Sequence, residues 1–143
     1  MNKVAMLGIS LVALFMVGCQ SVAIRDDLAK VEAGNASTIA KDWSALIATQ
    51  FNVSTVFVLK GQGAIGQALA EALRKKGYGV SSFSEAEELR GTTLEVRTDN
   101  IGKKGVLVSL VVDKNIINRS YRLTTEGMTP NSRFTQLTSK GGE

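Results

Sequence analysis

The chain has 143 residues, with 17 Lys and Arg against 13 Asp and Glu, no histidine and a single cysteine. Without histidine the commonest general base and a favoured metal ligand are missing, and one cysteine cannot form an internal disulfide. The net charge is +4, and the basic residues are scattered along the chain, with clusters only at 74–76 and 103–104. Solvated charges at a helix end and in a turn explain these two clusters. We therefore expect no catalytic residue, no metal site, no cofactor and no direct contact with nucleic acid.

Residues 1–18 have the anatomy of a bacterial secretory signal peptide. Lys3 precedes a largely apolar run from Val4 to Val17. This run is shorter than the roughly 20 apolar residues that a membrane-spanning helix needs. It ends in Met16-Val17-Gly18-Cys19, which resembles the lipobox, in which small residues precede a cysteine that is acylated before cleavage. We expect residues 1–18 to be cleaved and Cys19 to become the lipid-modified first residue of an envelope protein.

The residues around the expected cleavage site also indicate a location. Cys19 is the only thiol, and an exported protein usually pairs its thiols or lacks them, so a lipid on this sulfur accounts for it. A triacylated cysteine supplies several chains, which gives durable attachment. Gln20 follows it, whereas in lipoproteins of diderm bacteria an aspartate there tends to retain the protein at the inner membrane. By that resemblance we expect the protein to be located at the periplasmic face of the outer membrane, held there by its lipid.

Residues 19–36 are interpreted as a lipidated tether. They are mostly polar, and Ile24, Leu28 and Val31 have the spacing of one helical face, which Gly34-Asn35 would end. Such a segment is either flexible or becomes ordered against a partner protein.

Residues 37–140 are expected to form one small domain. Ser37 or Thr38 can cap a helix that ends near Gln50. Its apolar stripe consists of Ile39, Trp43, Leu46 and Ile47. A strand over 55–60 and a helix over 64–76 follow, and the stripe of this helix consists of Ile65, Leu69 and Leu73 with Ala68 and Ala72 beside it. Gly77 ends the helix, and a second strand covers 80–83.

The rest of the chain has the pattern of antiparallel strands. We expect strands over 92–98, 106–112 and 116–125, separated by turns at 102–105 and 113–115. The run 106–112 is nearly all apolar, so it is predicted to be a central strand covered on both faces. Tyr121 and Leu123 should point inward, Pro130 should lie in an irregular segment, and 133–137 should form a last short strand. The expected fold class is therefore α+β, with two helices packed on a small, mostly antiparallel sheet of three or four strands.

One motif is typical of a different protein class. A strand leads into Gly61-x-Gly63-x-x-Gly66, which opens a helix, and Glu85, Glu87 and Glu88 follow about where the ribose-binding acid of a dinucleotide-binding fold lies. The chain nevertheless continues with antiparallel hairpins instead of further βα units, and an exported protein is separated from the cytoplasmic nucleotide pools. We interpret Gly61 and Gly63 as a tight turn and Gly66 as allowing close packing.

Two segments resemble a known family. The two segments are IGQALAEALRKKGYGV at 65–80 and SYRLTTEGMTPNSRFTQL at 120–137. Together with the lipobox and the tether, these segments resemble the TrbH family of conjugal transfer lipoproteins. The specific parts are Lys76-Gly77-Tyr78-Gly79-Val80 and the segment from Arg119 to Gly127. The resemblance covers most of 38–137 and brings no catalytic motif with it.

The resemblance implies a structural component of a conjugative type IV secretion system. The expected partners are the other subunits of the outer-membrane core of this system, and the outer membrane itself, through the lipid anchor. Copies of this chain are expected to repeat around a ring. An alternative is an envelope lipoprotein that regulates a cell-wall enzyme or assists envelope assembly. A dinucleotide-binding enzyme is a third hypothesis.

Overall fold

The computed structural model describes residues 33–61, 63–82 and 90–138. These form two helices and seven strands, in the order α1 (Ala33–Gln50), β1 (Val56–Lys60), α2 (Ala64–Lys75), β2 (Gly79–Ser82), β3 (Thr92–Ile101), β4 (Gly105–Val112), β5 (Asn115–Thr124), β6 (Gly127–Pro130) and β7 (Thr135–Thr138). The expected signal peptide, Cys19 and the glutamates at 85–88 lie outside the described residues. Neither helix in the described ranges has the length and hydropathy of a membrane span.

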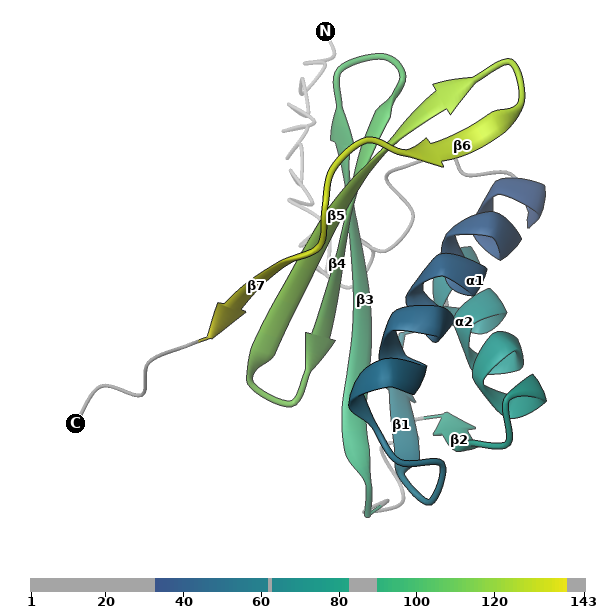
Figure 1. Ribbon diagram of the computed structural model, residues 1–143, viewed down its shortest axis with the longest axis vertical. Helices are drawn as coiled ribbons and strands as arrows, with labels where there is room; N and C mark the ends of the chain where they lie inside the picture. The colour runs from purple at the N-terminus through teal and green to yellow at the C-terminus, as the bar shows by residue number, and fades with distance from the viewer. Residues whose placement is uncertain (1–32, 62, 83–89, 139–143) are drawn as a thin grey trace, which may run out of the picture.

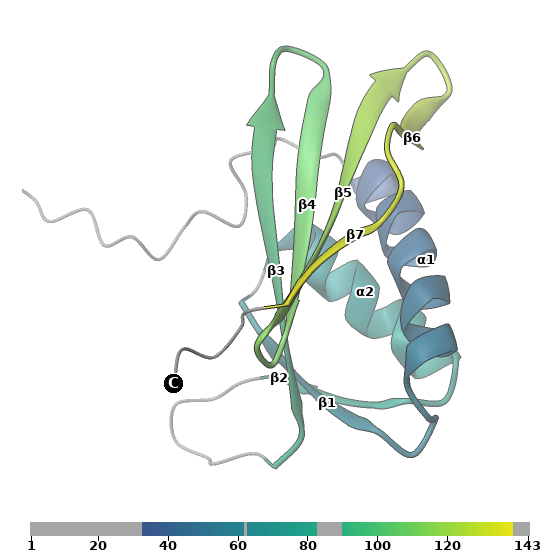
Figure 2. The same ribbon diagram turned by 60° about the vertical axis from the view of Figure 1, so that its left-hand side comes forward.

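All seven strands belong to one mixed sheet. The strand order is β2-β1-β3-β4-β5-β6, and β7 also pairs with β5. β1 runs parallel to β2 and β3, and every other pairing is antiparallel. Both helices lie on the same face of this sheet (Figures 1 and 2). The α+β class is thus confirmed, although the sheet has more strands than the three or four expected.

The hydrophobic core lies between the helices and this face of the sheet. Ile39, Trp43 and Ile47 of α1 are almost fully buried, as the predicted stripe requires. The Trp43 ring meets Phe134 edge to face, with centroids 4.9 Å apart. On α2 the predicted stripe is buried as well, and burial of each such aliphatic side chain contributes about 1.5–3 kcal/mol. The Tyr78 hydroxyl, just after α2, donates to the carbonyl of Phe51 at 2.8 Å and ties the end of α2 to the end of α1.

The first helix begins earlier than the sequence predicts. Gly34 and Asn35 were expected to end a tether helix, but both lie inside α1, which starts at Ala33. Asn35 Oδ1 accepts a hydrogen bond from the backbone N–H of Met128 at 3.3 Å, and Ala36 is buried in the core. These tertiary contacts with β6 stabilise a helical turn that its composition alone disfavours.

Three further expectations about the sheet are wrong. β4 was predicted to be covered on both faces, but its residues alternate between buried and half-buried, so only the face toward the helices is closed. Leu123 was expected to point inward, yet it is 41% exposed, because this end of β5 extends past the helices (Figure 1). Pro130 was expected in an irregular segment but is the last residue of β6, a short strand where a missing N–H is tolerated.

Candidate functional site

Gly61 alone among the three glycines of the Gly-x-Gly-x-x-Gly motif needs to be glycine for its backbone conformation. Its φ is +90°, in the region that L side chains avoid. Gly63 is the N-cap of α2 with φ −64° and ψ 156°, an ordinary extended conformation. Gly66 is buried, but a Cβ there would lie 3.8 Å from two methyl carbons of Leu59, an ordinary contact distance. Packing against β1 therefore does not require a glycine at position 66.

The hollow beside this turn is small. Its volume is about 10 Å³, and it is lined by glycines of the turn together with Lys60, Ile65 and Val96. A space of this size holds at most about one water molecule, and a dinucleotide is many times larger. The geometry therefore supports a structural interpretation of the motif, in which Gly61 reverses the chain between β1 and α2.

Replacing Gly66 with alanine is expected to stabilise the protein. Alanine inside a helix is favoured over glycine by about 0.5–1 kcal/mol, and the Cβ has room. The matched variant Gly61→Ala should instead cost about 1 kcal/mol or more, because its φ is positive. Urea unfolding of both variants measures the difference. A destabilised Gly66→Ala variant would contradict the packing described above.

A charged cluster that the sequence analysis did not single out joins α1 to β5. Arg119 donates from Nη1 to Asp42 Oδ1 at 2.9 Å and from Nε to the carbonyl of Ser132 at 3.1 Å. The Tyr121 hydroxyl donates to Asp42 Oδ2 at 2.5 Å. The guanidinium also lies 4.2 Å from the centre of the Phe134 ring, which gives a cation–π contact. This cluster holds together α1, β5 and the segment that precedes β7.

The environment of Tyr121 keeps its phenol neutral. Burial raises its pKa well above the ordinary value of 10, the hydrogen bond to the Asp42 carboxylate and its charge raise it further, and Arg119 opposes them. The Trp43 Nε1–H lies near this hydroxyl, and its proximity lowers the pKa of Tyr121 slightly. Its distance or angle does not meet the criteria for a hydrogen bond, so this buried N–H has no hydrogen-bond partner among the described residues. A neutral tyrosine committed to a carboxylate is typical of a structural link.

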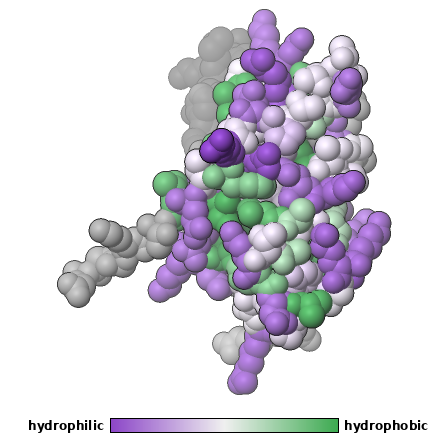
Figure 3. All heavy atoms as spheres, viewed as in Figure 1, coloured by the Kyte–Doolittle hydropathy of each residue, from purple (hydrophilic) through white to green (hydrophobic). Residues whose placement is uncertain are grey.

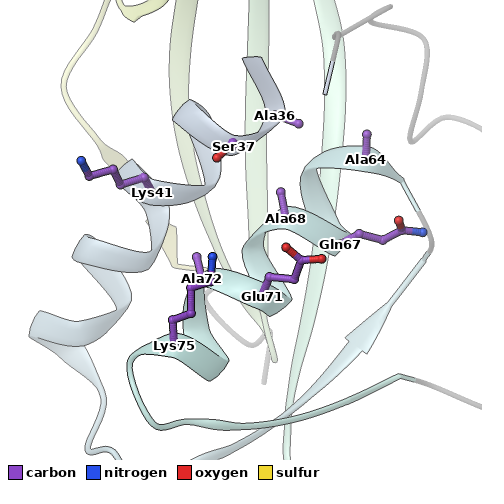
Figure 4. A pocket seen from close by; sticks show the side chains of 9 residues that line it. All are labelled: Ala36, Ser37, Lys41, Ala64, Gln67, Ala68, Glu71, Ala72 and Lys75. Atoms are coloured by element: carbon purple, nitrogen blue, oxygen red, sulfur yellow. The ribbon is translucent and has the colours of Figure 1, made fainter. Parts of the chain in front are cut away.

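A shallow groove lies between α1 and α2 (Figure 4). Its volume is about 450 Å³. Alanines at 36, 64, 68 and 72 form its floor, and polar side chains at 37, 41, 67, 71 and 75 form its rim. Ala68 and Ala72, which the sequence places beside the α2 stripe, line this groove, and Ala68 also packs against the core.

The two edges of the sheet are the other notable surfaces. Within the described ranges β2 pairs only with β1, and β7 pairs only with β5. Leu137 in β7 is 59% exposed, although its register partner Ile116 is half-buried. In the same ranges no group of three or more acidic or cysteine side chains could hold a metal ion.

The described part of the chain is thus a small α+β domain with two helices on one face of a mixed sheet (Figure 1). A family model described as conjugal transfer protein TrbH matches residues 19–140. The chain belongs to this family, which is defined by conjugal transfer and not by an enzymatic activity, and membership implies partners in the transfer machinery. No curated protein and no solved structure is significantly similar to the chain.

Proposed function

We propose that this protein is an outer-membrane lipoprotein that acts as a structural component of a conjugative type IV secretion system. The observation that carries the proposal is the family match, because it begins at Cys19, where the lipobox predicts the mature chain to begin. The lipid on Cys19 holds the chain at the periplasmic face of the outer membrane. Several acyl chains on one residue give attachment that a single chain does not.

The domain contributes to the assembly through contacts with neighbouring subunits. In a ring each subunit repeats the same contacts, so individually weak interfaces add up to a stable complex. Among the described strands β7 pairs only with β5, and its other edge supports contact by strand addition, in which a segment of a neighbour continues the sheet through backbone hydrogen bonds. The exposed Leu137 side chain supplies an apolar contact at the same edge.

A pull-down from cells that carry the native gene cluster tests this function. Tagged protein is extracted in mild detergent, and co-purifying subunits are quantified by mass spectrometry. We expect secretion-core subunits with the wild type and fewer with Leu137→Glu, which places a charge at the β7 edge. Val53→Glu is the matched control, because Val53 is 56% exposed and lies in the loop between α1 and β1. Both variants should keep their stability within about 0.5 kcal/mol.

The outcomes separate the function from the proposed contact. Recovery of a single cell-wall enzyme, or of no secretion subunit while the core stays intact, would contradict the structural role and favour the regulator of a cell-wall enzyme. Equal recovery with both variants would leave the role in place and overturn contact through β7.

A further inference from the structure

The tip of the β3–β4 hairpin gathers cations and exposed aliphatic side chains at one end of the domain. Lys103 and Lys104 form the turn and are exposed, and Arg122 of β5 lies beside them around a hollow of about 470 Å³. Ile101 and Leu123 are 50% and 41% exposed at the same end. Figure 3 shows hydrophilic side chains projecting from this end of the molecule. Such a mixture of cations and exposed aliphatic groups is typical of surfaces that contact a lipid bilayer.

The backbone holds this tip in a fixed shape. Gly102 has a φ of +64°, and a Cβ on Gly105 would lie only 2.5 Å from the carbonyl oxygen of Ile101, so the turn is tight. The N–H of Leu123 donates to the carbonyl of Lys104 at 2.7 Å and fastens the turn to β5. The cations are therefore presented together at one end of the sheet.

The chain enters the described domain at this same end. α1 begins beside β6, where Asn35 contacts Met128, and both hairpin tips lie at the end of the molecule where α1 starts (Figures 1 and 2). Residues 20–32 span at most about 45 Å when fully extended. An anchor on Cys19 therefore keeps this end of the domain within reach of the bilayer.

We infer that the hairpin tip binds the anionic phospholipid headgroups of the membrane that holds the anchor, an inference that rests on the proposed lipidation. Lys103, Lys104 and Arg122 pair with phosphate groups, and Ile101 and Leu123 enter the interface between headgroups and acyl chains. Two acidic residues at this end, Asp99 and Glu126, are outnumbered by the three cations. The binding orients the domain with α1 and the sheet pointing away from the bilayer.

Amine acylation of the lipidated full-length mature protein tests the inference. The protein is reconstituted in vesicles of phosphatidylcholine alone or with added phosphatidylglycerol, treated with a water-soluble acylating reagent and mapped by mass spectrometry. We expect Lys103 and Lys104 to be acylated several-fold more slowly in the anionic vesicles, and high salt to remove the difference. Lys75 and Lys76, at the end of α2 and at the opposite end of the domain, are the internal control and should not change.

A variant that leaves both reporter lysines in place provides a second test. Because each cation near an anionic bilayer strengthens binding about fivefold, Arg122→Glu should restore most of the acylation of Lys103 and Lys104. Arg90→Glu is the matched control, since Arg90 is exposed and lies at the other end of β3, and it should leave the protection unchanged.

Each result has a distinct meaning. Equal acylation in both vesicle types overturns the inference. If Lys103 and Lys104 are then protected only when secretion subunits are added to the vesicles, the partner is an acidic protein instead. Protein that does not float with either vesicle type contradicts the lipid anchor itself, because the anchor is expected to hold it on phosphatidylcholine. Failure of the proposed function and failure of the tip contact are therefore separable.

Discussion

Replacing Cys19 with serine is expected to abolish lipid attachment and release the protein from the outer membrane. In the proposed lipidation the Cys19 thiol is the nucleophile that takes up the lipid, and a serine hydroxyl is not an equivalent acceptor. Each buried CH₂ of an acyl chain contributes about 0.8 kcal/mol to membrane affinity, so loss of the chains removes the attachment. Labelling with an alkyne palmitate analogue, intact-mass analysis and membrane fractionation measure the effect.

The variant Gln20→Asp is the control for this experiment. It should keep the label but move the protein to the inner-membrane fraction, since only the sorting residue has changed. A wild-type protein that carries no label, or one that keeps residues 1–18, would contradict the predicted lipidation of Cys19.

Replacing Asp42 with alanine is expected to destabilise the domain by about 3 kcal/mol. The change leaves the Arg119 side chain, which is 18% exposed, and the buried hydroxyl of Tyr121 without their shared carboxylate. Breaking the pair between Glu95 and Arg97 with Glu95→Ala is the matched control. Those side chains are 30% and 52% exposed, so solvent screens the charges and the cost should stay below about 1 kcal/mol. Urea unfolding at neutral pH compares the two variants.

A double-mutant cycle tests whether the cluster acts as one unit. Asp42→Ala and Arg119→Ala are combined, and the coupling free energy is expected to be about 1–3 kcal/mol. Coupling near zero would mean that the cost of Asp42→Ala comes from another source, and the cluster would then not be what holds α1 to β5.

The sequence predicts local structure well wherever the physical signal is local. The spacing of Ile39, Trp43 and Ile47 defined the buried face of α1, and all three are in the core. The run of β-branched and aromatic residues before Gly61 predicted β1, and Gly77 ends α2 at a φ of +93° as expected. Propensity, periodicity and turn chemistry depend on neighbours in the chain, so the sequence alone decides them.

The lipidation of Cys19 stays a prediction, made from a linear motif that is read before the chain folds. The cluster around Asp42 could not be predicted in this way. Arg119 and Tyr121 are 77 and 79 positions away along the chain, and nothing local indicates that they meet Asp42. The concentration of cations around Lys103 is likewise hidden, because Arg122 joins the turn only through the pairing of β4 and β5.

The tertiary structure alone decided the order of strands, the faces that are buried and the start of α1. Two short strands, β6 and β7, share one edge of β5, an arrangement that their composition does not indicate. Leu123 is apolar yet exposed because the helices do not reach that end of β5. Gly34 is helical because contacts with β6 outweigh its low propensity. Burial and long-range pairing depend on what lies across space, and the free energy of packing against those neighbours overrides the weaker local preferences.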